Sequence, residues 1–425
     1  MQKSNRNTSK ILTSINKDII FIFFLGFFSL LIGHELQEDA TGGAKIDSIF
    51  LANYVELFSI NILDTLNNYD LDHSPVFYII QSIIYKITKN HNIFSYFYIF
   101  LSSFIPIVFY FCLCNKYKIN HTHFYYVAFL IYFSPYFRAS AIWSLGDNLS
   151  TLFFCLFTLF FIKAEKQKKL SNLHFLTLLF LVLTCYIRPI YFIFWFFLFV
   201  RNYQLFKIND LIRFIILSFF LALPAILYLF FFVIGKNNNA SLNTFLNVNF
   251  LEISIIVLSL ITFYILPFII HDYKNIFIFI RKKYKLLLTT LSLFIIYFIL
   301  DKFFFNDLFQ LTDLGGGVFY KLSQKFDLNF QYIMLISAYS GLIFYYYVSD
   351  KKELFNNSAL LLCLIFYSPI IYIFQKYYDP LLIIIFLTLL NSQKLSEYFS
   401  NKKIKVSFLY LYFILFYIFS FNYYS

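Results

Sequence analysis

Two aspartates stand where polar segments of the chain meet long apolar runs. Asp47 lies inside a polar stretch (residues 34–73), and Asp147 leads directly into the apolar run Leu149–Ile162. Only 13% of the residues are charged, and ionisable groups near a bilayer are costly. We therefore interpret both aspartates as catalytic, because a carboxylate can take a proton from a hydroxyl group and two carboxylates could share a divalent cation. In the alternative interpretation, each aspartate only caps the helix that follows it.

Basic and polar side chains at other segment ends are predicted to bind substrate. Arg188 precedes Pro189, where a helix should give way to extended backbone, and its guanidinium could hold a phosphate in a forked geometry. Lys376 and His73 are predicted phosphate contacts as well. The alternatives are snorkelling of Arg188 to lipid headgroups, an interfacial anchor at Lys376 and a helix cap at His73. The predicted substrate-binding set is His73, Asn148, Arg188, Lys376 and Tyr377.

The elements that must position these residues are transmembrane helices. The chain has 425 residues, of which 60% are hydrophobic, and a mean hydropathy of +0.71. Its apolar runs are hydrophobic on all faces, as in membrane spans and unlike the amphipathic helices of soluble proteins. The expected fold class is therefore an all-α polytopic membrane protein with about thirteen spans. These are placed at 18–33, 93–113, 121–135, 148–163, 172–187, 190–206, 211–233, 251–270, 286–305, 331–348, 357–375, 379–391 and 406–421.

The distribution of charge predicts how the chain is oriented. The net charge of +12 is scattered over short loops, which indicates membrane orientation and no nucleic-acid partner. If the segment Ser74–Ile87 does not cross, 24 of the 34 Lys and Arg residues fall on the cytoplasmic side, as the positive-inside rule requires. A helix over this segment would be about 21 Å long, against a hydrocarbon core of about 30 Å. Residues 1–17 are then cytoplasmic, and Asp47 and Asp147 both face outward from a plasma (inner) membrane.

One membrane domain is expected over residues 1–425, without a separate soluble domain. The first outer loop (34–92) is predicted to carry surface helices, because Ser48–Asn68 mixes apolar residues with Asn, Asp and Glu. Further spans are expected at 93–233 and at 234–425. Three glycines at 315–317 have no strand before them and no Gly-Lys-Ser/Thr after them, so a flexible outer loop is predicted there and no nucleotide site.

Four motifs stand in a recurrent order along the chain. An acid follows the first span and opens a helix (Asp47, with Tyr54 seven residues on), and a His-x-Pro-aromatic motif starts the next helix (73–78). A second acid, Asp147, begins a later span, and a basic-Tyr-x-x-Pro pattern lies near the end (376–380). This layout resembles the GT-C class of integral-membrane glycosyltransferases, and is similar to the dolichyl-phosphate-mannose-mannosyltransferase-like and aminoarabinose-transferase-like group. That group often has adjacent acids in the first loop. Here Asp47 is followed by Ser48, and the nearest adjacent acids are Glu38-Asp39.

The resemblance implies a GT-C-like fold and an enzyme that transfers a sugar from a polyprenyl-phosphate-linked donor to a lipid, glycan or protein acceptor on the outer face. Such a transfer needs a base beside the acceptor and positive charge beside the departing phosphate. Asp47 is expected to be the base, and Asp147 is expected to orient the acceptor. A divalent cation held by Asp47 and Asp147 is the only cofactor considered, and membrane lipids are the remaining expected partners.

Two other functions were weighed against transfer. A transporter or flippase of lipid-linked glycans would place acids and broken helices near mid-membrane in matching halves, whereas the acids here stand at span ends and the halves do not match. An O-antigen-type polymerase or ligase is expected to carry arginines in a large late outer loop, and Asn306–Phe330 contains none. Glycosyl transfer is therefore the favoured function.

Overall fold

The computed structural model describes residues 17–69, 71, 74–118, 123–228, 230–231, 250–304, 316–367, 375–400 and 406–424. Over these residues the regular structure is helical and includes no strand, which confirms the expected all-α class. The principal helices are α2 (Lys17–Glu35), α3 (Ala44–Ile60), α4 (Ile62–Asn67), α5 (Val76–Thr88), α6 (His91–Ser102), α7 (Phe104–Tyr117), α8 (His123–Phe129), α9 (Pro135–Ile142), α10 (Asp147–Ala164), α11 (Asn172–Ile187), α12 (Ile193–Leu205), α13 (Ile208–Tyr228), α15 (Phe250–Ile269), α16 (Tyr273–Lys282), α17 (Tyr284–Phe304), α18 (Gly317–Lys325), α19 (Phe330–Val348), α20 (Leu354–Ile365), α21 (Leu381–Thr388), α22 (Gln393–Ser400) and α23 (Val406–Tyr424). Short 3-10 helices join several of them, including η1 (Leu130–Phe133), η2 (Pro189–Phe192) and η7 (Gln375–Tyr377).

Several of these helices are long and apolar enough to cross a membrane. Within the described parts of the chain there are five such helical stretches, or six if a pair bent by 106° counts as one span. The five are His91–Tyr117, Asp147–Ala164, Ile208–Tyr228, Glu252–Lys282 and Val406–Tyr424, and the bent pair joins Phe330–Val348 to Lys351–Ile365. The chain thus has the helices of a membrane protein. The total of thirteen spans stays a prediction, because other apolar helices, such as α5 and α11, are shorter.

The expected spans 121–135 and 379–391 do not form one long helix each. Over the described part of the first, α8 ends at Phe129, η1 ends at Phe133, and a new helix, α9, begins at Pro135. The Ser134 side chain caps α9 by accepting a hydrogen bond from the Phe137 N–H (3.0 Å), and proline is suited to the first helical position because it needs no N–H partner there. The expected span 379–391 contains the eight-residue helix α21, which at 1.5 Å per residue is about 12 Å long. Caps and turns therefore divide apolar runs that hydropathy alone treats as continuous.

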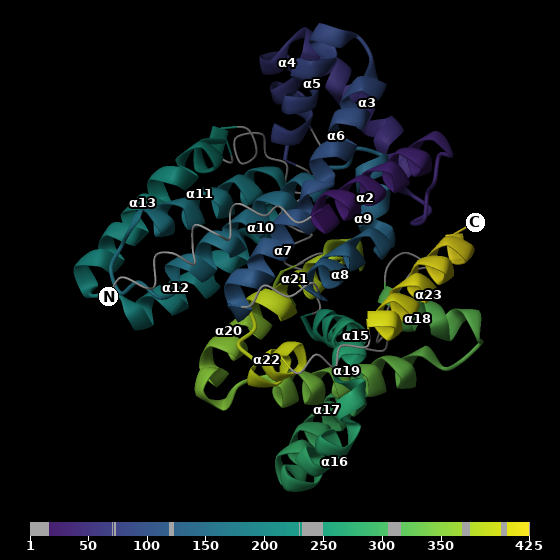
Figure 1. The fold of residues 1–425 in the computed structure, drawn as a ribbon, viewed down its shortest axis with the longest axis vertical. Coiled ribbons are helices and arrows are strands. Elements are labelled where there is room, and N and C mark those ends of the chain that lie inside the picture. The colour runs from purple at the N-terminus through teal and green to yellow at the C-terminus, as the bar shows by residue number, and fades with distance from the viewer. Residues whose placement is uncertain are drawn as a thin grey trace.

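The segment 34–92 forms a helical arm of α3, α4 and α5, at the top of Figure 1. The surface helix expected over Ser48–Asn68 is divided at Asn61, whose side chain caps α4 by accepting two backbone N–H groups. Phe58 of α3 is buried against a cluster that includes Phe77 of α5. Leu57 and other apolar side chains remain exposed on α3, as on helices that lie against lipid.

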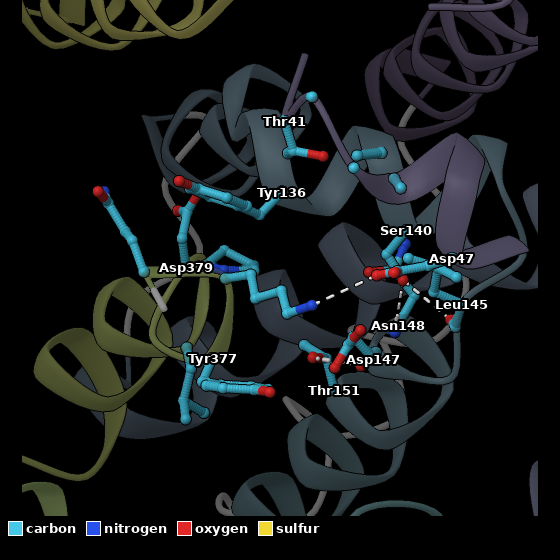
Figure 2. A pocket seen from close by; sticks show the side chains of 18 of the residues that line it. Thr41, Asp47, Tyr136, Ser140, Leu145, Asp147, Asn148, Thr151, Tyr377 and Asp379 are labelled. Carbon is cyan, nitrogen blue, oxygen red and sulfur yellow. Dashed lines mark hydrogen bonds and ion pairs between the residues drawn. The ribbon is translucent and has the colours of Figure 1, made fainter. Parts of the chain in front are cut away.

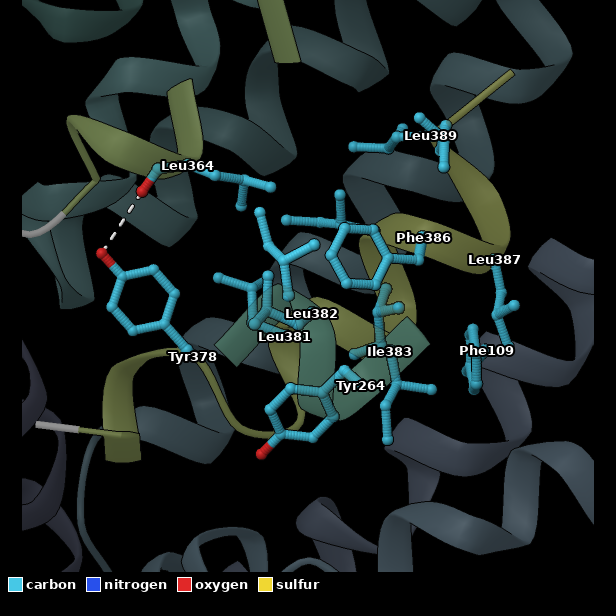
Figure 3. Packing of buried hydrophobic residues seen from close by; sticks show 14 of the residues in the cluster. Phe109, Tyr264, Leu364, Tyr378, Leu381, Leu382, Ile383, Phe386, Leu387 and Leu389 are labelled. Carbon is cyan, nitrogen blue, oxygen red and sulfur yellow. Dashed lines mark hydrogen bonds between the residues drawn. The ribbon is translucent and has the colours of Figure 1, made fainter. Parts of the chain in front are cut away.

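The core is centred on α21. All eight of its residues are buried, and it contacts α7, α10 and α15. Figure 3 shows Leu382 and Phe386 of α21 among side chains of neighbouring helices, with the Tyr378 hydroxyl donating to the Leu364 carbonyl (3.3 Å). A helix surrounded by protein on every side needs no polar face. The position of α21 places the turn that precedes it, residues 378–380, next to the cavity described below.

The contact between α15 and α19 depends on a glycine. A Cβ atom added at Gly341 of α19 would lie 2.0 Å from the Leu258 carbonyl oxygen of α15. Beside it, the Thr262 hydroxyl donates to the Ser337 carbonyl (2.5 Å). Small residues that allow two backbones to approach in this way are typical of helix pairs in membranes.

Replacing Gly341 with alanine is therefore expected to lower the stability of the protein. The clash involves backbone atoms, which cannot rotate away, so we expect a loss of about 1–3 kcal/mol, the usual cost of overpacking. Thermal unfolding of the purified protein in detergent would measure it. Gly43→Ala is the control, because a Cβ atom at Gly43 meets no atom within 4 Å. A Gly341→Ala protein that unfolds at the wild-type temperature would show that α15 and α19 are not in close contact.

Candidate active site

A cavity of about 290 Å³ lies where distant parts of the chain meet. Its wall includes residues between 41 and 47 at the start of α3, residues between 136 and 151 around the α9–α10 junction, and residues between 375 and 381 before α21. The rest of the wall is formed by Tyr191 of η2, Lys321 of α18, Tyr367, and Tyr424 of α23. The volume is close to the lower end of the range for small-molecule sites, about 300 Å³. The cavity is therefore large enough for one small ring, such as that of a sugar.

Both predicted catalytic aspartates line this cavity, and Figure 2 shows them on the same side of the view. Asp47 lies in the first turn of α3, and Asp147 is the first residue of α10. The N-cap positions of these helices are occupied by Gly43 and Gly146. The interpretation of the two aspartates as capping residues is therefore wrong. Their place in the first turn still stabilises them, because the positive end of the helix dipole faces them.

Lys376 approaches Asp47 across the cavity. Its Nζ atom lies 3.5 Å from Asp47 Oδ2, and the side chains of Lys376 and Asp47 are 28% and 48% exposed. The contact, marked by a dashed line in Figure 2, is longer than a hydrogen-bonded ion pair usually is. Asp47 was predicted as a base and Lys376 as a phosphate contact. The two side chains thus meet at one wall of the cavity.

Arg188 holds Asp147 from behind the cavity wall. Its Nη2 atom donates to Asp147 Oδ2 at 2.8 Å, and the two side chains are only 11% and 20% exposed. Arg188 ends α11 in extended backbone (φ −133°, ψ 100°), as expected for a residue that precedes proline. The snorkelling interpretation of Arg188 is wrong, because the guanidinium is buried and paired with a carboxylate. Arg188 does not itself line the cavity.

The other predicted substrate-binding residues have different positions. Tyr377 lines the cavity, and the Lys376 ammonium lies 5.7 Å from its ring centroid. Asn148 also lines the cavity, but its side-chain N–H groups are used within the protein, donating to the Phe137 carbonyl (3.0 Å) and to the Ser102 hydroxyl (3.2 Å). His73 lies outside the described residues.

The adjacent acids Glu38 and Asp39 support the wall of the cavity. Glu38 receives two hydrogen bonds from Arg138, from Nε to Oε1 (2.7 Å) and from Nη2 to Oε2 (2.5 Å), in a buried pair. Asp39 accepts the backbone N–H groups of Gly42 (3.0 Å) and Lys45 (3.1 Å), which shapes the loop leading into α3. Of Glu38, Asp39 and Asp47, Asp47 alone lines the cavity.

Comparison of the chain with protein-family models, with curated proteins and with solved structures finds no match. We therefore infer the function from the side chains of the cavity. Besides Asp47 and Asp147, its wall carries two lysines and five tyrosines (Tyr136, Tyr191, Tyr367, Tyr377 and Tyr424). A carboxylate can accept a proton, an ammonium group can stabilise a developing negative charge, and tyrosines offer an apolar ring together with a hydroxyl group.

One acidic and one basic residue of the cavity wall were not predicted from the sequence. Asp379 lies in the motif at 376–380, where only the lysine and tyrosine were singled out, and its Oδ2 accepts a hydrogen bond from the Ser134 hydroxyl (2.6 Å). Lys321 belongs to the segment predicted as a flexible outer loop, but α18 begins at Gly317 and carries it into the cavity. The same segment also holds Lys325 and three aspartates, so nothing in the sequence distinguishes Lys321.

The expected divalent cation stays a prediction. Among the residues that the structure describes, no group of three or more His, Cys, Asp or Glu side chains could hold a metal ion. Asp47 and Asp147 are each paired with a basic side chain instead. These pairs already balance the charge that would attract a cation.

Proposed function

We propose that this chain is a membrane glycosyltransferase, which moves a sugar from a polyprenyl-phosphate-linked donor to a lipid, glycan or protein acceptor. The meeting of Asp47 and Lys376 in one cavity carries this proposal, because the two residues stand 329 positions apart in the sequence. Their chemistry is what the transfer needs, a base for the acceptor and a cation for the leaving group. The tyrosine-rich wall supports it as well, since sugars present both apolar faces and hydroxyl groups.

The transfer is a substitution at the sugar carbon that bears the phosphate. Asp47 accepts the proton of the acceptor hydroxyl, the acceptor oxygen forms a bond to this carbon, and the bond from the carbon to the phosphate oxygen breaks. The electron pair of the broken bond leaves with the phosphate. Lys376 stands where its ammonium group could turn from Asp47 towards that oxygen, because their 3.5 Å contact is loose. Asp147, held by Arg188 at 2.8 Å, is positioned to orient the acceptor.

We further propose that the protein is a multi-pass protein of the plasma (inner) membrane with its N-terminus in the cytoplasm. The positive-inside distribution of Lys and Arg supports this orientation. The cavity would then face outward, where an energised lipid-linked donor replaces the nucleotide sugars of the cytoplasm.

Loss of the chain is expected to remove a sugar from a surface glycan. Mass spectrometry of lipid, glycan and protein fractions from a strain lacking the protein should show one product that is lighter by one sugar. Wild-type protein should restore the mass and the Asp47→Asn variant should not, although both insert in the membrane. Surface glycans of unchanged mass in all fractions would contradict the proposed function.

A further inference from the structure

Lys321 is a buried cation in the wall of the cavity. It lies on α18, its exposed fraction is 7%, and its Nζ atom donates hydrogen bonds to the Tyr136 hydroxyl (3.1 Å) and to the Tyr424 hydroxyl. The rings of Tyr424 and Tyr423 also surround it, with centroids 4.4 and 5.5 Å from Nζ. Helices α9, α18 and α23 therefore hold one ammonium group in place.

This cation lacks the counter-charge that three other basic residues near the cavity have. Lys376 pairs with Asp47, Arg188 with Asp147 and Arg138 with Glu38. Lys321 forms no ion pair with any described residue, although Asp379 lines the same cavity. A buried charge without a partner is costly, and burial lowers the pKa of Lys321 to about 8. At neutral pH the group is still mostly charged.

The groups around Lys321 cannot supply the missing negative charge. An ammonium group has three N–H donors and no acceptor, whereas a tyrosine hydroxyl both accepts and donates. Two of the ammonium donors are used by Tyr136 and Tyr424, whose hydroxyls also hydrogen-bond to each other, and all three residues line the cavity. The third ammonium N–H and the hydroxyl hydrogen that this pair does not use are complementary to an oxyanion. A neutral hydroxyl ligand would leave the buried charge uncompensated.

We propose that Lys321, with the hydroxyls of Tyr136 and Tyr424, binds a phosphate group of the ligand that enters this cavity. The inference rests on the proposed function only for the source of the phosphate, which would be the lipid-linked donor. It adds to the phosphate site a cation that has no carboxylate partner, whereas the ammonium group of Lys376 is shared with Asp47 before transfer.

Binding of short-chain probes tests this proposal without any transfer reaction. Full-length protein in detergent would be titrated calorimetrically with farnesyl phosphate, with farnesol and with inorganic phosphate. The variants are Lys321→Met, which keeps the length of the side chain but removes its charge, and Lys321→Arg, which keeps the charge. Lys325→Met is the matched control, because Lys325 is an exposed lysine of the same helix. Tyr424→Phe removes one hydroxyl and keeps the ring, so it replaces Lys321→Met if that variant does not fold.

The wild-type protein is expected to bind farnesyl phosphate more tightly than farnesol. Lys321→Met should weaken farnesyl phosphate binding by about tenfold or more, the effect of losing a hydrogen bond to a charged group, and should leave farnesol binding unchanged. Lys321→Arg and Lys325→Met should stay close to wild type, and Tyr424→Phe should bind several-fold more weakly. Equal affinity of Lys321→Met and wild type for farnesyl phosphate would overturn the inference and leave the proposed function standing.

The source of the phosphate is decided by the other probes. If inorganic phosphate binds in a Lys321-dependent way while farnesyl phosphate binds no better than farnesol, the phosphate site stands and the lipid-linked donor is contradicted. If neither phosphate probe binds wild-type protein, the inference is overturned, and the glycan measurements then decide the proposed function separately.

Discussion

Replacing Asp47 with asparagine is expected to reduce sugar transfer by about 10²–10⁴-fold, the usual contribution of a general base. Asparagine has nearly the same shape but cannot accept the acceptor proton. Asp47 and Lys376 are 48% and 28% exposed, and ion pairs of this kind contribute about 0–1 kcal/mol to stability. The variant should therefore fold and insert normally while losing its activity. Transfer would be measured with purified protein and a radiolabelled polyprenyl-phosphate sugar.

The matched control is Asp64→Asn. Asp64 is an exposed aspartate on α4, in the same helical arm, and it does not line the cavity. Its variant should transfer sugar at the wild-type rate. Asp39→Asn is a second comparison, because Asp39 holds the loop before α3 and not the acceptor; it should lower thermal stability more than it lowers the rate at saturating substrate. An Asp47→Asn protein with wild-type activity would exclude Asp47 as the base.

Breaking the pair of Asp147 and Arg188 is expected to have the largest effect on stability. Their side chains are 20% and 11% exposed, and removing one member of a buried ion pair leaves an uncompensated charge at a cost of about 3–5 kcal/mol. Arg188→Met and Asp147→Asn should each lower the free energy of unfolding by about this amount. The double variant should recover much of the loss, because an uncharged pair of similar size is often tolerated. Denaturant titration of the four proteins would measure the coupling.

The control for this cycle is Glu56→Gln, which disrupts the exposed contact between Glu56 and His91. It is expected to leave stability almost unchanged, because exposed ion pairs contribute little. If the losses of Arg188→Met and Asp147→Asn simply added in the double variant, Asp147 and Arg188 would not interact as the structure shows.

Kinetic measurements give a second test of the role of Arg188, because Arg188 contacts Asp147 and does not line the cavity. Variants of Arg188 should therefore impair use of the acceptor at least as much as use of the donor. Loss of a direct phosphate contact would instead impair use of the donor more.

Local features of the site could be predicted because they depend on neighbouring residues. Apolar runs indicate helices, and the change from a polar to an apolar run marked Asp147 as the start of one. Pro189 predicted the extended backbone at Arg188. The divisions at Asn61 and Ser134 were missed, although both residues are good caps, because hydropathy averages over a window longer than a cap.

Pairing across the cavity could not be predicted in the same way. The sequence contains several basic residues that could have met each aspartate, and nothing local distinguishes among them. Asp47 was preferred as the active acid, but no local pattern showed that the nearby Glu38 would instead be paired with Arg138. Lys321 was missed because its burial results from the packing of α9, α18 and α23 around it and not from its neighbours in the chain.

The sequence by itself determined that this is an all-α protein with helices able to span a membrane, and that Asp47 and Asp147 stand near the starts of helices. Hydrophobicity and helix starts are properties of short segments, so the residues of each segment are sufficient to specify them. Only the tertiary structure decided which charges meet. The pairs Asp147–Arg188, Glu38–Arg138 and Asp47–Lys376 join residues 41, 100 and 329 positions apart. Contacts over such separations depend on how all the intervening helices pack, which no local pattern records.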